Sequence, residues 1–260
     1  MINPVRASLP RALIAALTFH VNWLEGTRGY LPGNWDVLWS LSVEETFYLL
    51  FPLLCVALRR ERWILLAMVA LIIVGPVNRM VLDGRDPWSD YAYLSCMDGI
   101  AFGCLAAWVS ARMHSNKIVL RAALVIGMAS VILVIVLRAL TVKLGLTNLG
   151  LNVTVLELGT ALVLYSLTNG VGNSALSNGT AVIQLVGRNS YEIYLTHMFV
   201  IFGMMHVFGL VLGDSPHFSA YLIAYASTLA LSIVLGTVVS RWYSEPLNQK
   251  FRKHMRLGIK

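Results

Sequence analysis

Apolar stretches of helical length follow one another along the chain, separated by short polar segments. A helix needs roughly 20 apolar residues to cross the hydrocarbon core of a bilayer, and each stretch comes close to that length. The pattern predicts eight membrane-spanning helices, over residues 10–24, 41–58, 63–82, 92–111, 118–138, 150–169, 189–212 and 218–240. The expected fold is therefore an all-α integral membrane protein, a bundle of about eight transmembrane helices.

The polar segments between these stretches carry residues that favour turns. They include Pro32-Gly33-Asn34, Asp83-Gly84 and the Ser, Asn and Gly residues of 169–179. No internal repeat or low-complexity block divides the chain. We expect residues 1–260 to form a single membrane domain.

Composition supports a membrane protein. Hydrophobic residues make up 57% of the chain and charged residues 13%, about half the charged fraction of a typical soluble domain. The formal net charge of +7 lies in short clusters between the apolar stretches and in the C-terminal tail, not on one continuous basic face. This distribution argues against a nucleic-acid partner. The cysteines Cys55, Cys96 and Cys104 lack the spacing of metal ligands, so neither a metal site nor a disulfide framework is expected.

Lys and Arg residues also predict the orientation of the chain. If eight helices alternate across the membrane, fifteen of the 20 Lys and Arg residues fall on the side that holds both ends. The cytoplasmic side of membrane proteins is enriched in these residues, so we expect both termini to be cytoplasmic.

Ionisable residues within the predicted helices are candidates for a site. A charged side chain inside a bilayer costs several kcal/mol and normally faces the bundle interior. The candidates are Glu44, Glu45, Asp98, Glu157, His197 and His206, with Arg79 and Glu245 at helix ends. Glu157 lies deep in its helix and needs a partner or a proton. Asp98 precedes glycines that favour close helix packing, and Arg79 has a side chain long enough to extend to an interface.

The segment WSLSVEETFY, residues 39–48, carries the most specific chemistry. Ser42 and Glu45 have the spacing of a capping box at the start of a helix. Glu44 has no such local task, and it shares a helix face with Tyr48, four residues later. Glu44 is a candidate general base or a group that orients a hydroxyl; the alternative is a solvated acid in an interfacial aromatic belt. His197 also has two interpretations, a hydrogen-bonded packing residue or a proton acceptor.

Four stretches resemble the acyltransferase 3 family of membrane acyltransferases. WSLSVEETFYLLFPLL is similar to the family's Trp-Ser-Leu run before Glu-x-x-Phe-Tyr, with the family's glutamate at Glu44. VGRNSYEIYLTHMFV resembles a block that ends in a histidine, here His197, and SRWYSEPLNQKFRK resembles the closing Glu-Pro, here Glu245. AYLSCMDGIAFGCLAAW resembles an Arg-x-Asp stretch, with Cys96 where an arginine is usual. The resemblance covers roughly residues 13–253.

The resemblance implies an O-acyltransferase in the bacterial inner (plasma) membrane. It would move an acetyl or other short acyl group from acyl-CoA, most simply acetyl-CoA, to a hydroxyl of a cell-surface glycan or lipid-linked sugar. Glu44 and His197 are the expected catalytic residues. Residues expected to bind the acceptor are Trp39, Ser40, Tyr48, Arg79, Asp98, Glu157 and Glu245. Arg59, Arg60 and Arg188 are expected to attract the phosphates of the CoA.

The chain departs from the family pattern at its front. The family's first helix carries an Arg and a His about ten residues apart, and a second helix follows. Arg11 and His20 form a similar pair, but their surroundings resemble the family's third helix, so we expect this chain to lack the first two helices. Two other functions stay open: a catalytically silent fragment or partner subunit, and a small transporter of a glycan intermediate.

Overall fold

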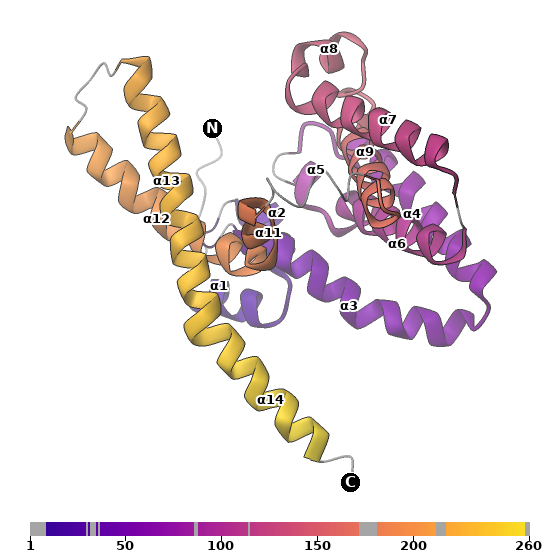
Figure 1. Ribbon diagram of the computed structural model, residues 1–260, viewed down its shortest axis with the longest axis horizontal. Helices are drawn as coiled ribbons and strands as arrows, with labels where there is room; N and C mark the ends of the chain where they lie inside the picture. Colours follow the sequence, from indigo (N-terminus) through magenta and orange to yellow (C-terminus); the bar gives the residue numbers. More distant parts are fainter. Residues whose placement is uncertain are drawn as a thin grey trace. The chain divides into compact units, whose positions relative to one another are not determined.

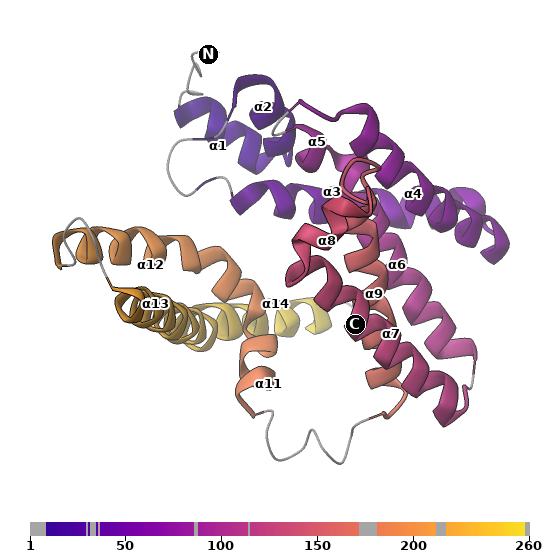
Figure 2. The same cartoon turned by 90° about the horizontal axis from the view of Figure 1, so that it is seen from above.

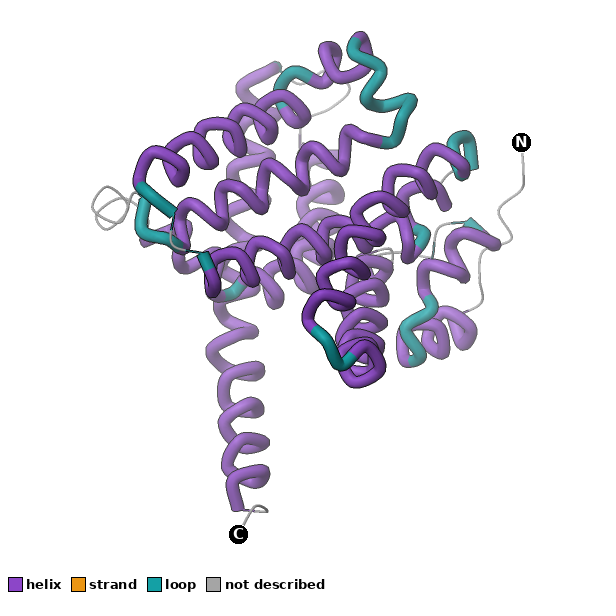
Figure 3. The backbone as a smooth tube through the Cα atoms, turned by 90° about the vertical axis from the view of Figure 1, so that its right-hand side faces the viewer, coloured by secondary structure: helices purple, strands orange, loops and turns teal. Residues whose placement is uncertain are grey.

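The computed structural model describes residues 9–29, 31, 35, 37–85, 88–113, 115–171, 181–211 and 217–257. These residues form helices joined by short turns, with no strand among them (Figure 3). The chain divides into two compact units, Met1–Ser174 and Ala175–Lys260. Each unit is compact by itself.

The first unit holds most of the helices (Figure 1). They are α1 (Leu9–Leu17), α2 (Val21–Arg28), α3 (Leu38–Leu58), α4 (Glu61–Val81), α5 (Trp88–Tyr91), α6 (Tyr93–Arg112), α7 (Lys117–Ile135), α8 (Arg138–Lys143) and α9 (Leu151–Thr168). Helix α6 packs against both α4 and α9, and α9 also packs against α7 (Figure 2). Helices α4, α6 and α9 are therefore neighbours, although they are far apart in the sequence.

Glycines allow these helices to approach closely. A Cβ at Gly127 of α7 would lie 2.6 Å from the carbonyl oxygen of Gly159 in α9. A Cβ at Gly75 of α4 would overlap the carboxyl group of Asp98 in α6. Small residues at such contacts let membrane helices gain van der Waals packing between their backbones.

The prediction of one helix over residues 10–24 was wrong, because the chain breaks between α1 and α2. Thr18 Oγ1 donates to the carbonyl of Ile14, and the His20 amide donates to the carbonyl of Ala15. Phe19 between them adopts a left-handed conformation with φ 55°. A left-handed residue with this hydrogen bond ends a helix, a position usually taken by glycine.

The second unit contains α11 (Ala181–Arg188), α12 (Ser190–Val211), α13 (Phe218–Val239), the π-helical turn η2 (Ser240–Ser244) and α14 (Glu245–Leu257). Helices α12 and α13 pack together, and a Cβ at Gly236 would overlap Ile193. Helix α13 passes through η2 into α14 without an intervening loop, so the three form one long helix (Figure 1).

Seven of the described helices are long and apolar enough to cross a membrane. They are α3, α4, α6, α7, α9, α12 and the helix over Phe218–Lys253. Seven of the eight predicted spans are therefore confirmed. Large apolar side chains on these helices are exposed, for example Val56 at 70% and Ile73 at 60%, as expected where helices face lipid.

Two predicted turns, the orientation of the chain and its division into domains stay predictions. Pro32, Gly33, Asn34 and most of the predicted turn over residues 169–179 lie outside the described residues. That both termini are cytoplasmic and that the chain forms a single domain stay predictions.

Candidate functional site

A buried ion pair joins α4 to α6 in the first unit. Arg79 is 5% exposed and Asp98 is fully buried. The pairing is bidentate, because Arg79 Nη1 donates to Asp98 Oδ1 at 3.1 Å and Nη2 donates to Oδ2 at 2.5 Å. A planar guanidinium and a carboxylate fit this geometry well, and the pair is among the stronger hydrogen-bonded contacts that proteins make.

Every donor of the Arg79 guanidinium has an acceptor. Nε donates to the carbonyl of Gly150 at 2.9 Å, Nη1 donates also to the carbonyl of Ser95, and Nη2 donates also to Thr154 Oγ1 at 2.5 Å. With the two bonds to Asp98, all five N–H groups are used. Thr154 in turn donates to Asp98 Oδ2 at 2.9 Å, so α9 is joined to the same pair. The geometry therefore favours a role for Arg79 in holding α4, α6 and α9 together.

Glu157 lies beside this buried network, one turn after Thr154 on α9. Its carboxyl group interacts with that of Asp98 and covers Gly99, where a Cβ would lie 2.6 Å from Glu157 Oε1. Glu157 Oε2 is buried and has no hydrogen-bond partner among the described residues. An unsatisfied buried oxygen is uncommon and calls for an explanation such as a ligand.

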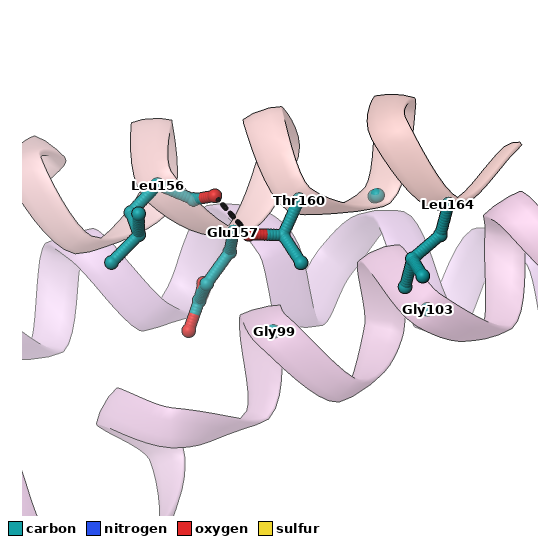
Figure 4. A pocket seen from close by; sticks show the side chains of 7 residues that line it. Gly99, Gly103, Leu156, Glu157, Thr160 and Leu164 are labelled. Carbon is teal, nitrogen blue, oxygen red and sulfur yellow. Dashed lines mark hydrogen bonds between the residues drawn. The ribbon is translucent and has the colours of Figure 1, made fainter. Parts of the chain in front are cut away.

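Glu157 also lines a pocket between α6 and α9 (Figure 4). The pocket has a volume of about 230 Å³ and is open on one side. Its lining is apolar apart from Glu157 and Thr160 and consists of Gly99, Gly103, Leu156, Glu157, Thr160, Ala161 and Leu164. Thr160 Oγ1 donates to the carbonyl of Leu156 at 2.8 Å, as the dashed line in Figure 4 marks. Arg79, Asp98 and Glu157, three of the predicted site residues, therefore meet beside one cavity.

The predicted residues of α3 do not join this cluster. Glu44 is exposed and makes no hydrogen bond or ion pair in the described part of the chain, while Tyr48 is 61% exposed. Ser40 donates to the carbonyl of Val37 at 3.4 Å. Trp39 stacks on Tyr91 of α5, with ring centroids 4.4 Å apart and an interplanar angle of 8°.

The predicted capping box was wrong. Helix α3 begins at Leu38, so Ser42 lies one turn inside the helix and not at its start. The Ser42 hydroxyl is buried and donates to the carbonyl of Leu38 at 3.0 Å. The four residues before Ser42 already belong to the helix, and the aromatic contact of Trp39 with α5 stabilises this turn.

The remaining predicted residues are exposed or half-buried. Arg59 and Arg60 lie at the turn between α3 and α4, where Arg59 has φ 51°. In the second unit, Arg188 ends α11 and Glu245 begins α14, and both are exposed. His197, on α12, is half-buried, and its Nδ1 lies 2.5 Å from the carbonyl oxygen of Tyr194. A carbonyl oxygen only accepts, so this contact requires Nδ1 to donate, and in the tautomer with its proton on Nδ1 the acceptor nitrogen is Nε2.

Several residues of the buried network were missed by the sequence analysis. Thr154 and Ser95 are uncharged, and no pattern marks them, although Thr154 lies three residues before Glu157 on the same helix face. Asn22 and Glu25 of α2 are also fully buried, whereas the first predicted helix was expected to end before Glu25. In the described residues, no group of three or more His, Cys, Asp and Glu side chains is arranged to hold a metal ion.

Comparisons with known proteins identify a family. A family model described as an acyltransferase domain, that of the acyltransferase 3 group, matches residues 12–237, which is most of the chain. No curated protein and no solved structure gives a match. The matched region contains the buried pair, the pocket, Glu44 and His197.

Proposed function

The chain belongs to the acyltransferase 3 family, and from this we propose that it transfers a short acyl group from acyl-CoA to a hydroxyl of a cell-surface glycan or lipid-linked sugar. The observation that carries the proposal is the family match over residues 12–237. The seven apolar helices fit a multi-pass integral membrane protein. We place it in the bacterial inner membrane, where cytoplasmic acyl-CoA and the precursors of surface glycans are both within reach.

In the proposed reaction, the acyl group moves from the thioester of acyl-CoA to the acceptor hydroxyl, where it forms an oxygen ester. The acceptor hydroxyl oxygen attacks the thioester carbonyl carbon, a C–O bond forms, the C–S bond breaks, and CoA leaves as a thiol that takes up the hydroxyl proton. A general base that accepts this proton contributes typically 10²–10⁴-fold to the rate of such a step. The chain therefore needs a proton acceptor with an available lone pair.

Two residues are proposed for this role. His197 suits it because the contact of Nδ1 with the Tyr194 carbonyl fixes the tautomer and leaves Nε2 to accept a proton. Glu44 suits it because its side chain is exposed and makes no hydrogen bond or ion pair with any described residue. Each is proposed by itself, since Glu44 belongs to the first unit and His197 to the second.

Acceptor and donor contacts complete the proposal. Trp39, Ser40 and Tyr48 share α3 with Glu44, and aromatic rings beside a carboxylate are suited to a sugar ring. Arg59, Arg60 and Arg188 are exposed cations that would attract the phosphates of CoA. Glu245 is proposed as a further polar contact for the acceptor.

The test is transfer of labelled acetyl from acetyl-CoA into glycan in membranes that contain the folded chain. Glu44→Gln is expected to lower incorporation at least tenfold, while Glu45→Gln, one residue away, serves as its matched control. His197→Gln is paired in the same way with His206→Gln on the same helix. No incorporation by the wild type, in membranes where the protein is folded and inserted, would overturn the proposal.

A further inference from the structure

Two carboxyl groups meet in the interior of the first unit beside a single guanidinium. Asp98 of α6 is fully buried, and Glu157 of α9 reaches it across the helix contact, where a hydrogen bond joins the two side chains. An ionised carboxylate only accepts hydrogen bonds, so a hydrogen bond between two carboxyl groups requires one of them to carry a proton. The contact between α6 and α9 therefore contains a proton.

The proton belongs to Glu157. Both oxygens of Asp98 already accept from Arg79, Oδ1 at 3.1 Å and Oδ2 at 2.5 Å, and Oδ2 also accepts from Thr154 Oγ1 at 2.9 Å. Asp98 is thus an acceptor on both oxygens. Glu157 has no comparable set of donors, because its Oε2 is buried without a hydrogen-bond partner among the described residues. Glu157 is therefore the donor in the contact and Asp98 the acceptor.

The charges of this cluster lead to the same count. Arg79 supplies one positive charge, and its N–H groups are all used on Asp98, Thr154 and two backbone carbonyls. If Asp98 and Glu157 were both ionised, two negative charges would face one positive charge between apolar helices, where an unbalanced charge is unfavourable. One proton on Glu157 makes the cluster neutral.

The other groups beside Glu157 leave this count unchanged. Cys96 of α6 interacts with both carboxyl groups, but it is a neutral thiol that donates to the carbonyl of Asp90 at 3.1 Å. Helix α7 meets this part of α9 with Gly127 and Ser130, which do not titrate. The charged residues of α7 lie near its start, beside the C-terminal end of α9, and are Lys117 and Arg121.

We propose that Glu157 binds one proton in the folded chain and that this proton fastens α9 to α6. With the proton in place, Glu157 donates to Asp98 across the helix contact. Without it, two carboxylates in direct contact repel each other, and the packing of α9 on α6 is weakened at Gly99, which the carboxyl group of Glu157 covers. The proton is required for the fold and not for acyl transfer, so this role goes beyond the proposed function.

A proton held in this way makes the stability of the chain depend on pH. An exposed glutamate loses its proton at about pH 4.3. Above that pH the folded chain holds one proton more than the unfolded chain, until Glu157 itself is deprotonated. Over this range each rise of one pH unit multiplies the equilibrium constant of unfolding by up to about ten. The stabilisation by the proton is therefore complete at low pH and is lost as the pH rises.

The test compares the wild type with Glu157→Gln, unfolded by SDS from mild detergent at several pH values between about 5 and 9. Gln donates an N–H to Asp98 where the acid donates an O–H, but it does not lose a proton in this range. The ratio of the unfolding constants, wild type over Glu157→Gln, is expected to rise at least about tenfold from the lowest to the highest pH. A constant ratio would overturn the proposal.

Glu61→Gln provides the matched control, because Glu61 is 45% exposed and pairs with Arg112. The ratio of wild type to Glu61→Gln is expected to change less than about twofold over the same range, since an exposed carboxylate holds no proton there. An equal rise for Glu61→Gln would also overturn the proposal, because the pH dependence would then not belong to Glu157.

Infrared spectroscopy of the protein in membranes at pH 7 detects the proton directly. A protonated carboxyl group has a carbonyl stretch at a frequency where neither a carboxylate nor an amide absorbs. The wild type and Glu61→Gln are expected to show a band of this kind that Glu157→Gln lacks. Identical spectra would overturn the proposal, and so would a stability that rises with sodium chloride but not with choline chloride, because a sodium ion would then neutralise Glu157 in place of the proton.

Discussion

Removing one partner of the buried pair should destabilise the first unit strongly. Asp98→Asn leaves the guanidinium of Arg79, which is 5% exposed, without a counter-charge. Arg79→Met likewise leaves the fully buried carboxylate of Asp98 without a counter-charge. Breaking a buried pair in this way costs about 3–5 kcal/mol, because the remaining charge is desolvated and unpaired. The double variant Arg79→Met/Asp98→Asn removes both charges, so it should be more stable than the sum of the two single losses predicts.

The chain contains a matched control for this experiment. Arg112 and Glu61 join the same two helices, α6 and α4, with an Nη2–Oε2 distance of 2.9 Å, but their side chains are 60% and 45% exposed. Exposed pairs contribute roughly 0.2–1 kcal/mol, so Arg112→Met and Glu61→Gln should each have a small effect.

The assay is a titration of the protein from mild detergent into SDS, followed by tryptophan fluorescence. Free energies of unfolding of the two single variants, the double variant and the wild type give the coupling energy between Arg79 and Asp98. We expect a coupling of about 3 kcal/mol or more for the buried pair and less than about 1 kcal/mol for the exposed pair. Additive single variants, each within about 1 kcal/mol of the wild type, would refute a structural role for the buried pair.

Two further helix contacts and one helix end can be tested in the same titration. Gly127→Leu would place a side chain against the carbonyl of Gly159, so we expect a loss of about 1–3 kcal/mol; an unchanged stability would show that α7 and α9 separate freely. Arg59→Gly should raise the free energy of unfolding by about 1 kcal/mol because Arg59 has φ 51°, whereas Arg60→Gly, in extended backbone, should not raise it. Ser166→Ala removes a fully buried hydroxyl that donates to a backbone carbonyl and should cost about 1 kcal/mol; no loss would mean that another donor replaces it.

Long apolar stretches were sufficient to predict most of the fold. Helices α3, α4, α6, α7, α9, α12 and α13 begin and end within about three residues of their predicted bounds, since length and hydropathy dominate where a helix crosses a bilayer. The break between α1 and α2 could not be predicted. It lacks a glycine or proline, and the left-handed residue that forms it is Phe19, a residue type that rarely adopts this conformation.

The sequence predicted the charged residues of the site but not which of them lie together. Arg79, Asp98 and Glu157 are conspicuous in apolar helices, so the sequence marked them individually. Their grouping depends on which helices are neighbours, and the sequence contains no pattern that pairs α4 with α6 and α9. The pocket depends on Gly103, where the lack of a side chain leaves space. A single sequence does not show which glycines leave such a space unfilled.

The continuous helix from Phe218 to Lys253 is longer than the hydrocarbon layer of a membrane is thick. Its 36 residues measure about 54 Å at 1.5 Å per residue. Even at a tilt of about 40°, the helix rises about 41 Å along the membrane normal, more than the roughly 30 Å of hydrocarbon. The polar residues of α14 therefore extend beyond the hydrocarbon layer as a continuation of α13. The basic side chains of Lys250, Arg252 and Lys253 are thus joined by one continuous helix to the contact between Gly236 and Ile193.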